Sequence, residues 1–248
     1  MISVSEVTFS YNGGSPVFDD FSWGVASGEM WSIIGPSGCG KSSLLYLMSG
    51  LRQPQRGYVQ VNGETIKGPQ PNVGLILQDY GLLPWATIYE NAALGLKLRG
   101  TERDEERHRV GMWLETLDLT SVAERYPSQI SGGQRQRVAI ARTLAMEPEI
   151  LLMDEPFGSL DAITRESLQD IILDLRRRLS ITTVVVTHNI EEAVLLGRKI
   201  MILCNPPNLK PIVLDNPEAG NPEYRDDSEF YITCRGVRES IGKVAKRC

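Results

Sequence analysis

The first residues that could do chemistry form a glycine-rich run, GPSGCGKS, at residues 35–42. The run fits the pattern G-x-x-x-x-G-K-[S/T], and it lies between a short apolar strand pattern and a helical pattern. Glycines let successive backbone N–H groups point at phosphate oxygens, and the helix that follows adds its positive end. The Lys41 ammonium can then reach the β- and γ-phosphates, and the Ser42 hydroxyl can bind Mg²⁺. The alternative is a glycine-rich turn without a ligand.

Two adjacent acidic residues end a second strand pattern, ILLMDEP, at residues 150–156. Successive strand residues point to opposite faces, so Asp154 and Glu155 cannot do the same job. Asp154, at the carboxyl end of the strand, can hold Mg²⁺ through water. Glu155 can act as the general base that polarises an attacking water. The alternative is a strand-ending turn with two solvated acids.

A second phosphate-shaped surface is expected in the run ISGGQRQRVAIAR, residues 130–142. Ser131 is a natural N-cap, and two glycines at the start of a helix leave backbone N–H groups open to an anion. The chain has one phosphate loop, and this second anion-binding surface lies about ninety residues away in a different predicted subdomain. The economical explanation is a nucleotide held by another copy of the chain. This predicts a head-to-tail dimer with two shared sites.

The elements that must position these residues show a strand–helix–strand pattern. Residues 150–154 and 181–187 are almost continuously apolar, which indicates burial on both faces and hence a parallel sheet. The apolar residues between them keep helical spacing, so the three segments form a βαβ unit. Apolar residues also recur at helical spacing over 85–146, which predicts a helical subdomain inserted between core strands. Asn62-Gly63 predicts a hairpin over residues 58–66.

The composition excludes several classes of protein. The 248 residues carry a net charge of −5, 42 % are hydrophobic and 23 % are charged, which is close to an average globular domain and excludes general disorder. The absence of a basic excess argues against nucleic acid as a partner. We expect no membrane span and no signal peptide. The four cysteines, Cys39, Cys204, Cys234 and Cys248, are scattered and predict thiols rather than disulfides or a metal site.

The order of the three motifs, a phosphate loop, SGGQ and MDEP, resembles that of the ATPase subunit of an ABC transporter. The SGGQ run makes this resemblance specific, because other P-loop ATPases and kinases lack it, and the likeness extends over residues 11–204. It implies an α/β fold of the P-loop NTPase type, with a parallel-sheet core, an antiparallel β subdomain and an inserted helical subdomain. We expect the boundaries 1–84 and 148–204 for the two parts of the core, 85–147 for the helical subdomain and 205–248 for a tail.

The resemblance implies roles for four further residues. Tyr11 would stack on adenine, Gln78 would sense Mg²⁺ and the attacking water and face the membrane partner, and His188 would contact the γ-phosphate. Asp161 would link the two sites across the dimer. Each residue also has an alternative without a role in nucleotide chemistry. Tyr11 could be an aromatic of the core and Gln78 a surface amide. His188 could be a histidine with a structural role only, and Asp161 could be a helix N-cap.

The implied site is thus large. The expected catalytic residues are Lys41, Gln78, Glu155 and His188, and the expected Mg²⁺ contacts are Ser42, Gln78 and Asp154. The expected ATP contacts are Tyr11, Gly35, Pro36, Ser37, Gly38, Cys39, Gly40, Lys41, Ser42, Ser43, Ser131, Gly132, Gly133, Gln134 and Asp161. Cys39 lies beside Lys41 and a helix N-terminus, which both lower a thiol pKa, so we predict that alkylation of Cys39 abolishes ATPase activity and that ATP protects it.

Residues 78–85 and 157–165 further resemble the importer subfamily for nitrate, sulfonates, taurine and related small anions. Gln134 departs from that subfamily, where Met is frequent; Ile130 and Asn189 are small departures from the wider family. The resemblance implies ATP-driven dimerisation that powers import through a membrane permease, with a solute-binding protein as indirect partner. The subunit would be peripheral, at the cytoplasmic face of the inner membrane. The apolar residues Leu82 and Trp85 favour docking onto a permease helix.

Two other functions remain open at this point. A non-transport ABC-type ATPase, for example in iron–sulfur cluster assembly, would keep the nucleotide chemistry without a permease. A small-molecule P-loop kinase would leave SGGQ unexplained. The segment after residue 205 matches no motif: it shows a polar, proline-rich stretch at 211–227 and a last helix near 236–246. Its basic residues Lys243, Lys246 and Arg247 could contact anionic lipid. The simpler alternative is that they are the solvated end of a helix.

Overall fold

The structure is a computed structural model that describes residues 1–158 and 160–245. A six-stranded sheet with the order β10-β9-β3-β8-β7-β6 forms the core. Neighbours from β9 to β6 are parallel, and only the edge strand β10 is antiparallel. The strands are β3 (Met30–Ile34), β6 (Val73–Ile76), β7 (Ile150–Asp154), β8 (Thr182–Val186), β9 (Lys199–Ile202) and β10 (Ile212–Asp215).

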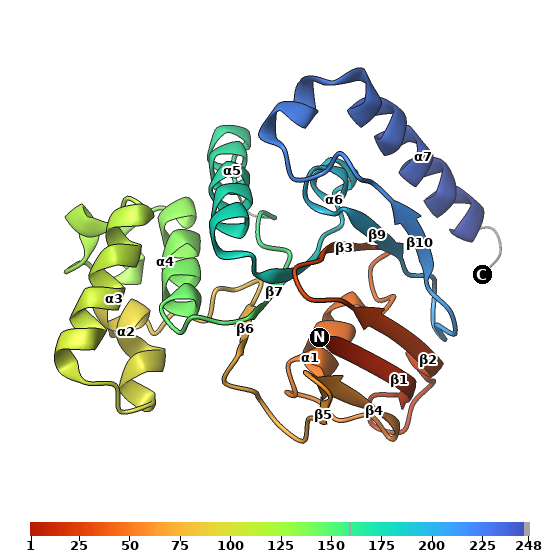
Figure 1. Cartoon of the computed structure of the whole chain (residues 1–248), viewed down its shortest axis with the longest axis horizontal. Helices are drawn as coiled ribbons and strands as arrows, with labels where there is room; N and C mark the ends of the chain where they lie inside the picture. The colour runs from red at the N-terminus through yellow and green to blue at the C-terminus, as the bar shows by residue number, and fades with distance from the viewer. Residues whose placement is uncertain (159, 246–248) are drawn as a thin grey trace.

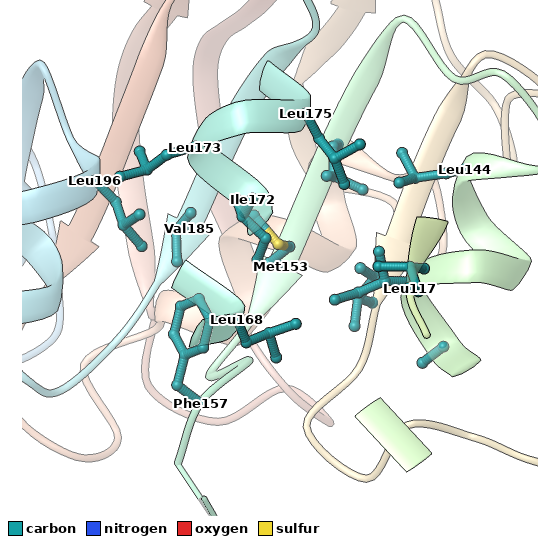
Figure 2. Packing of buried hydrophobic residues seen from close by; sticks show 14 of the residues in the cluster. Leu117, Leu144, Met153, Phe157, Leu168, Ile172, Leu173, Leu175, Val185 and Leu196 are labelled. Carbon is teal, nitrogen blue, oxygen red and sulfur yellow. The ribbon is translucent and has the colours of Figure 1, made fainter. Parts of the chain in front are cut away.

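The central strands confirm the expected parallel sheet and βαβ unit. Every residue of β3, β7 and β8 is buried, because helices cover one face of the sheet, and a helix together with a second, antiparallel sheet covers the other. Helix α5 (Ala162–Leu179) connects β7 to its parallel neighbour β8. Figure 2 shows how Leu168, Ile172 and Leu175 of α5 pack toward Met153 of β7. This packing fixes the loops that leave the carboxyl ends of the strands.

A second, four-stranded sheet has the order β2-β1-β4-β5, and all of its pairs are antiparallel. Its strands are β1 (Ile2–Phe9), β2 (Phe18–Val25), β4 (Arg56–Val61) and β5 (Glu64–Thr65). The expected hairpin is present, and Asn62 and Gly63 both have positive φ at its turn. Buried Phe18 and Phe21 of β2 belong to one cluster with Leu44 of helix α1 (Lys41–Met48). This cluster holds the start of α1 beside the sheet.

Helices α2 (Ile88–Leu98), α3 (Arg103–Thr116) and α4 (Gly132–Leu144) form a separate group at one end of the molecule (Figure 1). They confirm the helical pattern expected over 85–146, and the short 3₁₀ turns η1 (Thr120–Val122) and η2 (Pro127–Gln129) lie between α3 and α4. Thr87 begins α2 with a capping box to Glu90. Val110, Trp113 and Val138 join this group to the core cluster that includes α5.

The C-terminal segment differs from what the sequence predicted. Residues 211–227 contain strand β10 and the 3₁₀ helix η3 (Pro222–Asp226), not only an irregular stretch. Helix α7 (Ser228–Ala245) begins well before the expected start and lies against α6 (Ile190–Leu196) (Figure 1). Lys243 is exposed, whereas Lys246 and Arg247 lie outside the described residues. Among the residues described, no helix has both the length and the apolar character needed to cross a membrane.

Candidate functional site

The glycine-rich loop follows β3 and leads directly into α1, as its motif requires. The Lys41 ammonium folds over the loop and donates hydrogen bonds to the carbonyl oxygens of Gly35 and Pro36, each at 3.0 Å. Gly40, the N-cap of α1, has a φ of 106°. A Cβ at this position would also lie 2.5 Å from the side chain of Val17. Glycine is therefore required at position 40 both for its backbone conformation and for space.

The Ser42 hydroxyl donates to the Asp154 carboxylate at 3.0 Å, which joins the start of α1 to the end of β7. Asp154 is only 2 % exposed. Burial raises the pKa of Asp154 and the nearby Glu155 charge adds to this, while the Ser42 hydrogen bond and the Lys41 charge act in the opposite direction. The result is a desolvated carboxylate that favours a nearby cation.

This donor set fits Mg²⁺ bound together with a nucleotide. Within residues 1–158 and 160–245, no three His, Cys, Asp or Glu side chains gather to hold a metal on their own. Mg²⁺ usually takes one or two protein oxygens and completes its shell with phosphates and water. The hydroxyl of Ser42 and the carboxylate of Asp154 would supply those protein oxygens.

Glu155 has a different environment from its neighbour Asp154. Its φ of 45° is rare for a residue with a side chain, and its backbone N–H donates to Val186 at 2.9 Å. The carboxylate lies 3.4 Å from the Gln78 amide nitrogen, which donates to it, and 3.2 Å from His188 Nδ1. Gln78, Glu155 and His188 follow β6, β7 and β8, three neighbouring parallel strands whose carboxyl ends meet at one edge. Ligands of α/β sheets bind at this edge.

Tyr11 lies at the rim of the same region. Its ring is 42 % exposed, its hydroxyl is 3.0 Å from Ser43 Oγ, and the edge of Phe9 supports it. The Arg52 guanidinium lies 5.8 Å from the ring centre. The alternative of a buried core aromatic is therefore wrong. The exposed face of the ring is available for stacking.

These residues line one open cavity of about 590 Å³. It gathers Tyr11, the phosphate loop, Gln78, Glu155 and His188, as the resemblance implied. Val17, which no sequence signal marked, lines it as well. The lining residues are Tyr11, Val17, Ser37, Gly38, Gly40, Lys41, Ser42, Ser43, Gln78, Glu155 and His188.

The cavity does not include the SGGQ residues or Asp161. Ser131 is the expected N-cap: its hydroxyl accepts from the Gln134 backbone N–H at 3.2 Å, and the Gln134 side chain accepts from the Ser131 N–H at 3.0 Å. Asp161 caps α5, and its hydrogen bonds from the backbone and hydroxyl of Thr164 lower its pKa. Ser131 and Asp161 are exposed, so both helix starts are open to another molecule.

The expected lowering of the Cys39 pKa is wrong. Cys39 is fully buried beneath the loop, and burial raises the pKa of its thiol by more than the Lys41 charge lowers it. The alkylation prediction thus loses its physical basis, since a buried thiol is neither accessible nor ionised. Cys39 and Cys234 are free thiols, and Cys248 lies outside the described residues.

Asn208 is a functional neighbour that sequence reasoning missed. Its side chain is buried, and its amide donates to the carbonyl oxygens of Cys39 at 2.8 Å and Val17 at 3.2 Å. Its own carbonyl oxygen accepts from the Cys204 N–H at 2.9 Å. Asn208 thereby ties the segment after β9 to the phosphate loop. No local pattern marks it, because Val17 and Cys39 are far away in the chain.

Comparison with known proteins agrees with this geometry. Residues 18–158 match a family model described as ABC transporter. The chain belongs to the ABC transporter family. This ABC ATPase is 43 % identical to the taurine import ATP-binding protein TauB of Pseudomonas aeruginosa over 191 residues, which are 77 % of this chain and 73 % of that protein. It is 41 % identical to TauB of Escherichia coli strain K12 over 207 residues, 84 % of this chain and 81 % of that one.

Solved structures agree at the level of the fold. A dimeric bacterial ABC transporter cassette, MJ0796, superposes with a TM-score of 0.78 at 32 % identity, over 87 % of this chain and 98 % of that one. The same cassette in a dimeric post-hydrolysis state with ADP and phosphate has a TM-score of 0.77 at 31 % identity, over the same 87 % and 98 %. The present chain is thus an ATPase of the P-loop NTPase fold, and a small-molecule kinase is excluded.

Proposed function

We propose that this ABC ATPase hydrolyses ATP to power import of a small sulfonate or related anion. The single observation that carries the ATPase part is the cavity that gathers the phosphate loop with Gln78, Glu155 and His188. The import part is supported by relatives at 41–43 % identity that are named taurine import ATP-binding proteins. These relatives also make a non-transport role, such as iron–sulfur cluster assembly, the less favoured alternative.

In the proposed site the adenine stacks on Tyr11, and the phosphates lie against the loop N–H groups and Lys41. Ser42 and Asp154 would hold Mg²⁺, which screens phosphate charge when it is bound. The Glu155 carboxylate accepts a hydrogen bond from the attacking water and orients it toward the γ-phosphate. Gln78 and His188 both contact Glu155 Oε2 and therefore fix the direction of its carboxylate.

The proposal includes a second copy of the chain. Ser131 and Asp161 are exposed helix caps outside the cavity, and the solved relative is dimeric. Two copies arranged head to tail would place the SGGQ residues of one protomer over the nucleotide of the other. ATP then favours the closed pair because it contacts both protomers only in that state.

The proposed membrane partner is a permease at the cytoplasmic face, which the subunit binds peripherally. Trp85 is 75 % exposed, and it lies just after the segment that carries Gln78. A large exposed aromatic ring suits the anchor of a helix-docking surface. Closure of the ATPase dimer would move this surface, and a solute-binding protein would choose the substrate.

The deciding experiment is size-exclusion chromatography of the Glu155→Gln variant with and without ATP and Mg²⁺. We expect a monomer without ATP and a dimer with it, since the variant keeps the binding residues but loses the carboxylate that orients water. Its hydrolysis should fall by at least about 10²-fold, the usual scale for a positioned base. Lys41→Ala is the matched control and should bind ATP weakly and stay monomeric.

Wild-type turnover in Glu155→Gln would contradict the role of Glu155 in orienting water. A dimer in Lys41→Ala would contradict closure of the dimer by ATP.

The proposed role in import has its own test. Vesicles that hold the co-expressed permease should retain this ATPase, and Trp85→Ala should release it. Retention on a soluble scaffold instead would favour the non-transport alternative.

A further inference from the structure

A buried polar chain begins at the residue before His188. The Thr187 hydroxyl donates to Glu192 Oε2 at 2.5 Å and accepts from the Asn189 N–H at 3.0 Å. Thr187 is 1 % exposed and Glu192, on α6, is 5 % exposed. These two hydrogen bonds hold the backbone on both sides of His188. Glu192 is therefore the anchor of the loop that presents the histidine to Glu155.

The same chain continues to α5. Arg165 Nε lies 3.6 Å from Glu192 Oε1, which is an ion pair without a hydrogen bond. The other end of the guanidinium donates through Nη2 to the carbonyl oxygen of Leu160 at 2.8 Å. Leu160 directly precedes Asp161. One polar chain thus joins the loop after β8 to the loop after β7.

These groups do not touch the nucleotide cavity. Arg165 and Glu192 line a different cavity, of about 490 Å³, between α5, α6, η3 and α7. Burial raises the pKa of Glu192, while the Thr187 hydrogen bond and the Arg165 charge oppose that effect. The Glu192 side chain is buried in this ion pair, whereas the Arg165 side chain is 31 % exposed. An ion pair of this kind contributes little net stability to a fold. Its presence here calls for a role other than stability.

We propose that Glu192 and Arg165 are positioning residues that set the His188 loop and the Asp161 loop in one fixed relation. The inference rests on the roles proposed above for His188 and Asp161. Loss of the anchor would let the His188 ring leave its place 3.2 Å from Glu155. Binding of ATP depends on the phosphate loop and Tyr11, so it would hardly change. The expected signature is a lower kcat with an unchanged KM for ATP.

Four variants test this with matched chemistry. Glu192→Met keeps the length of the side chain but removes the acceptor, and Thr187→Val keeps the shape but removes the hydroxyl. Both should lower kcat by about 10- to 100-fold, the scale of a misplaced catalytic group, with KM within about twofold. Glu192→Gln keeps an acceptor for Thr187 and should retain most of the activity. Glu191→Met, at an exposed position of the same helix, should match the wild type.

Arg165→Met tests the second half of the chain. It should also slow turnover, and the double variant Arg165→Met/Glu192→Met should be no slower than the slower single variant, because both act through one connection. Fully multiplicative losses would show two independent effects and would overturn the proposal.

A readout without hydrolysis separates this inference from the proposed function. The chain holds only two histidines, His108 and His188, so a histidine-labelled NMR spectrum is simple to assign with a His108→Gln variant. Glu192→Met and Thr187→Val should move the His188 resonance and leave that of His108 in place.

The results distinguish failure of the role proposed for His188 from failure of the positioning role. If His188→Ala hydrolyses ATP at the wild-type rate, the role proposed for His188 fails. If His188→Ala is slow but Glu192→Met and Thr187→Val behave as Glu191→Met does, with an unmoved His188 resonance, only the positioning role fails. A rise in KM with unchanged kcat would also overturn it.

Discussion

Asp154 and Glu155 illustrate how the end of a strand separates two carboxylates. Asp154 is the last residue of β7 and accepts from Ser42 in a buried place. Glu155 has a positive φ, which turns its side chain toward Gln78 and His188. One acid therefore faces the phosphate loop, and the other faces the Gln78 amide and the His188 ring. Their different environments support the different roles proposed for them.

We expect Asp154→Asn to raise the Tm of the nucleotide-free protein at neutral pH by a few degrees, the shift that about 1 kcal/mol gives a chain of this size. The pKa of Asp154 is raised in the folded protein, so its ionised form is destabilising there. That loss of stability is absent below the unfolded pKa, grows as the pH rises from the unfolded toward the folded pKa, and is complete above the folded pKa. The gain in Tm should accordingly vanish at acidic pH, where the carboxyl is protonated in both states.

The same variant should lose the extra stabilisation that Mg²⁺ adds to ATP, because an amide is a poorer ligand for the cation than a carboxylate. Differential scanning calorimetry at several pH values, with and without ATP and Mg²⁺, measures both effects. Asp226→Asn, at an exposed position, is the control. A lower Tm for Asp154→Asn at neutral pH would contradict the argument.

At the scale of elements, the start of α4 packs directly on the start of α5. A Cβ at Gly133, the second residue of α4, would lie 2.4 Å from the Thr164 methyl group Cγ2. Thr164 also donates to Asp161 through its backbone and its hydroxyl. The SGGQ turn and the Asp161 loop therefore depend on one contact. A change at either helix start should reach the other.

We predict that Gly133→Ala lowers the ATPase rate and the Tm, although alanine is otherwise the better helix residue by about 1 kcal/mol. The added methyl must displace Thr164 and with it the cap at Asp161. Thr164→Ser removes the clashing methyl group but keeps both hydrogen bonds. The double variant Gly133→Ala/Thr164→Ser should thus regain most of the Tm and the rate.

Thermal melting and steady-state phosphate release are the measurements for this pair. Thr164→Ser alone is the control and should resemble the wild type. Equal defects in Gly133→Ala and in the double variant would show that position 133 needs glycine for another reason, such as contact with a nucleotide.

At the scale of the whole molecule, the phosphate loop and the SGGQ turn lie in different places on one chain. The cavity holds the phosphate loop, whereas Ser131 and Asp161 lie outside its lining. The C-terminal segment braces this arrangement: Arg225 of η3 forms an ion pair with Asp170 of α5 at 2.7 Å, and Tyr224 donates to Asn216. Residues beyond the family match, which ends at residue 158, thus hold α5, the helix that Asp161 caps.

A mixing experiment tests the shared sites. Lys41→Ala removes the phosphate-loop half, and Ser131→Arg blocks the SGGQ half with a bulky side chain. Each variant alone should be inactive. In a mixed dimer, the loop of the Ser131→Arg chain meets the intact SGGQ of the Lys41→Ala chain, so one complete site forms. We expect mixing to restore ATP-dependent dimerisation, measured by chromatography with differently tagged chains; no mixed dimer at any ratio would contradict head-to-tail sharing.

Local sequence determined the chemistry and the main elements of this protein. The motif GPSGCGKS between a strand and a helix predicts a phosphate-binding loop from backbone geometry alone. Equally local patterns predict the helix cap at Ser131 and the β7–α5–β8 unit. Each of these features depends on interactions between residues that are close together in the sequence. The positions of Gln78, Glu155 and His188 at one edge follow from the parallel order of their strands.

Tertiary structure alone decided the features that depend on distant partners. The burial that raises the Cys39 pKa, the hold of Asn208 on the phosphate loop, and the Thr187–Glu192–Arg165 chain each join segments that are far apart in sequence. Strand β10 forms at the sheet edge because β9 offers it a partner, although its own segment is polar and rich in proline. Desolvation and long-range hydrogen bonds arise only when the chain is packed, so no pattern of neighbouring residues records them.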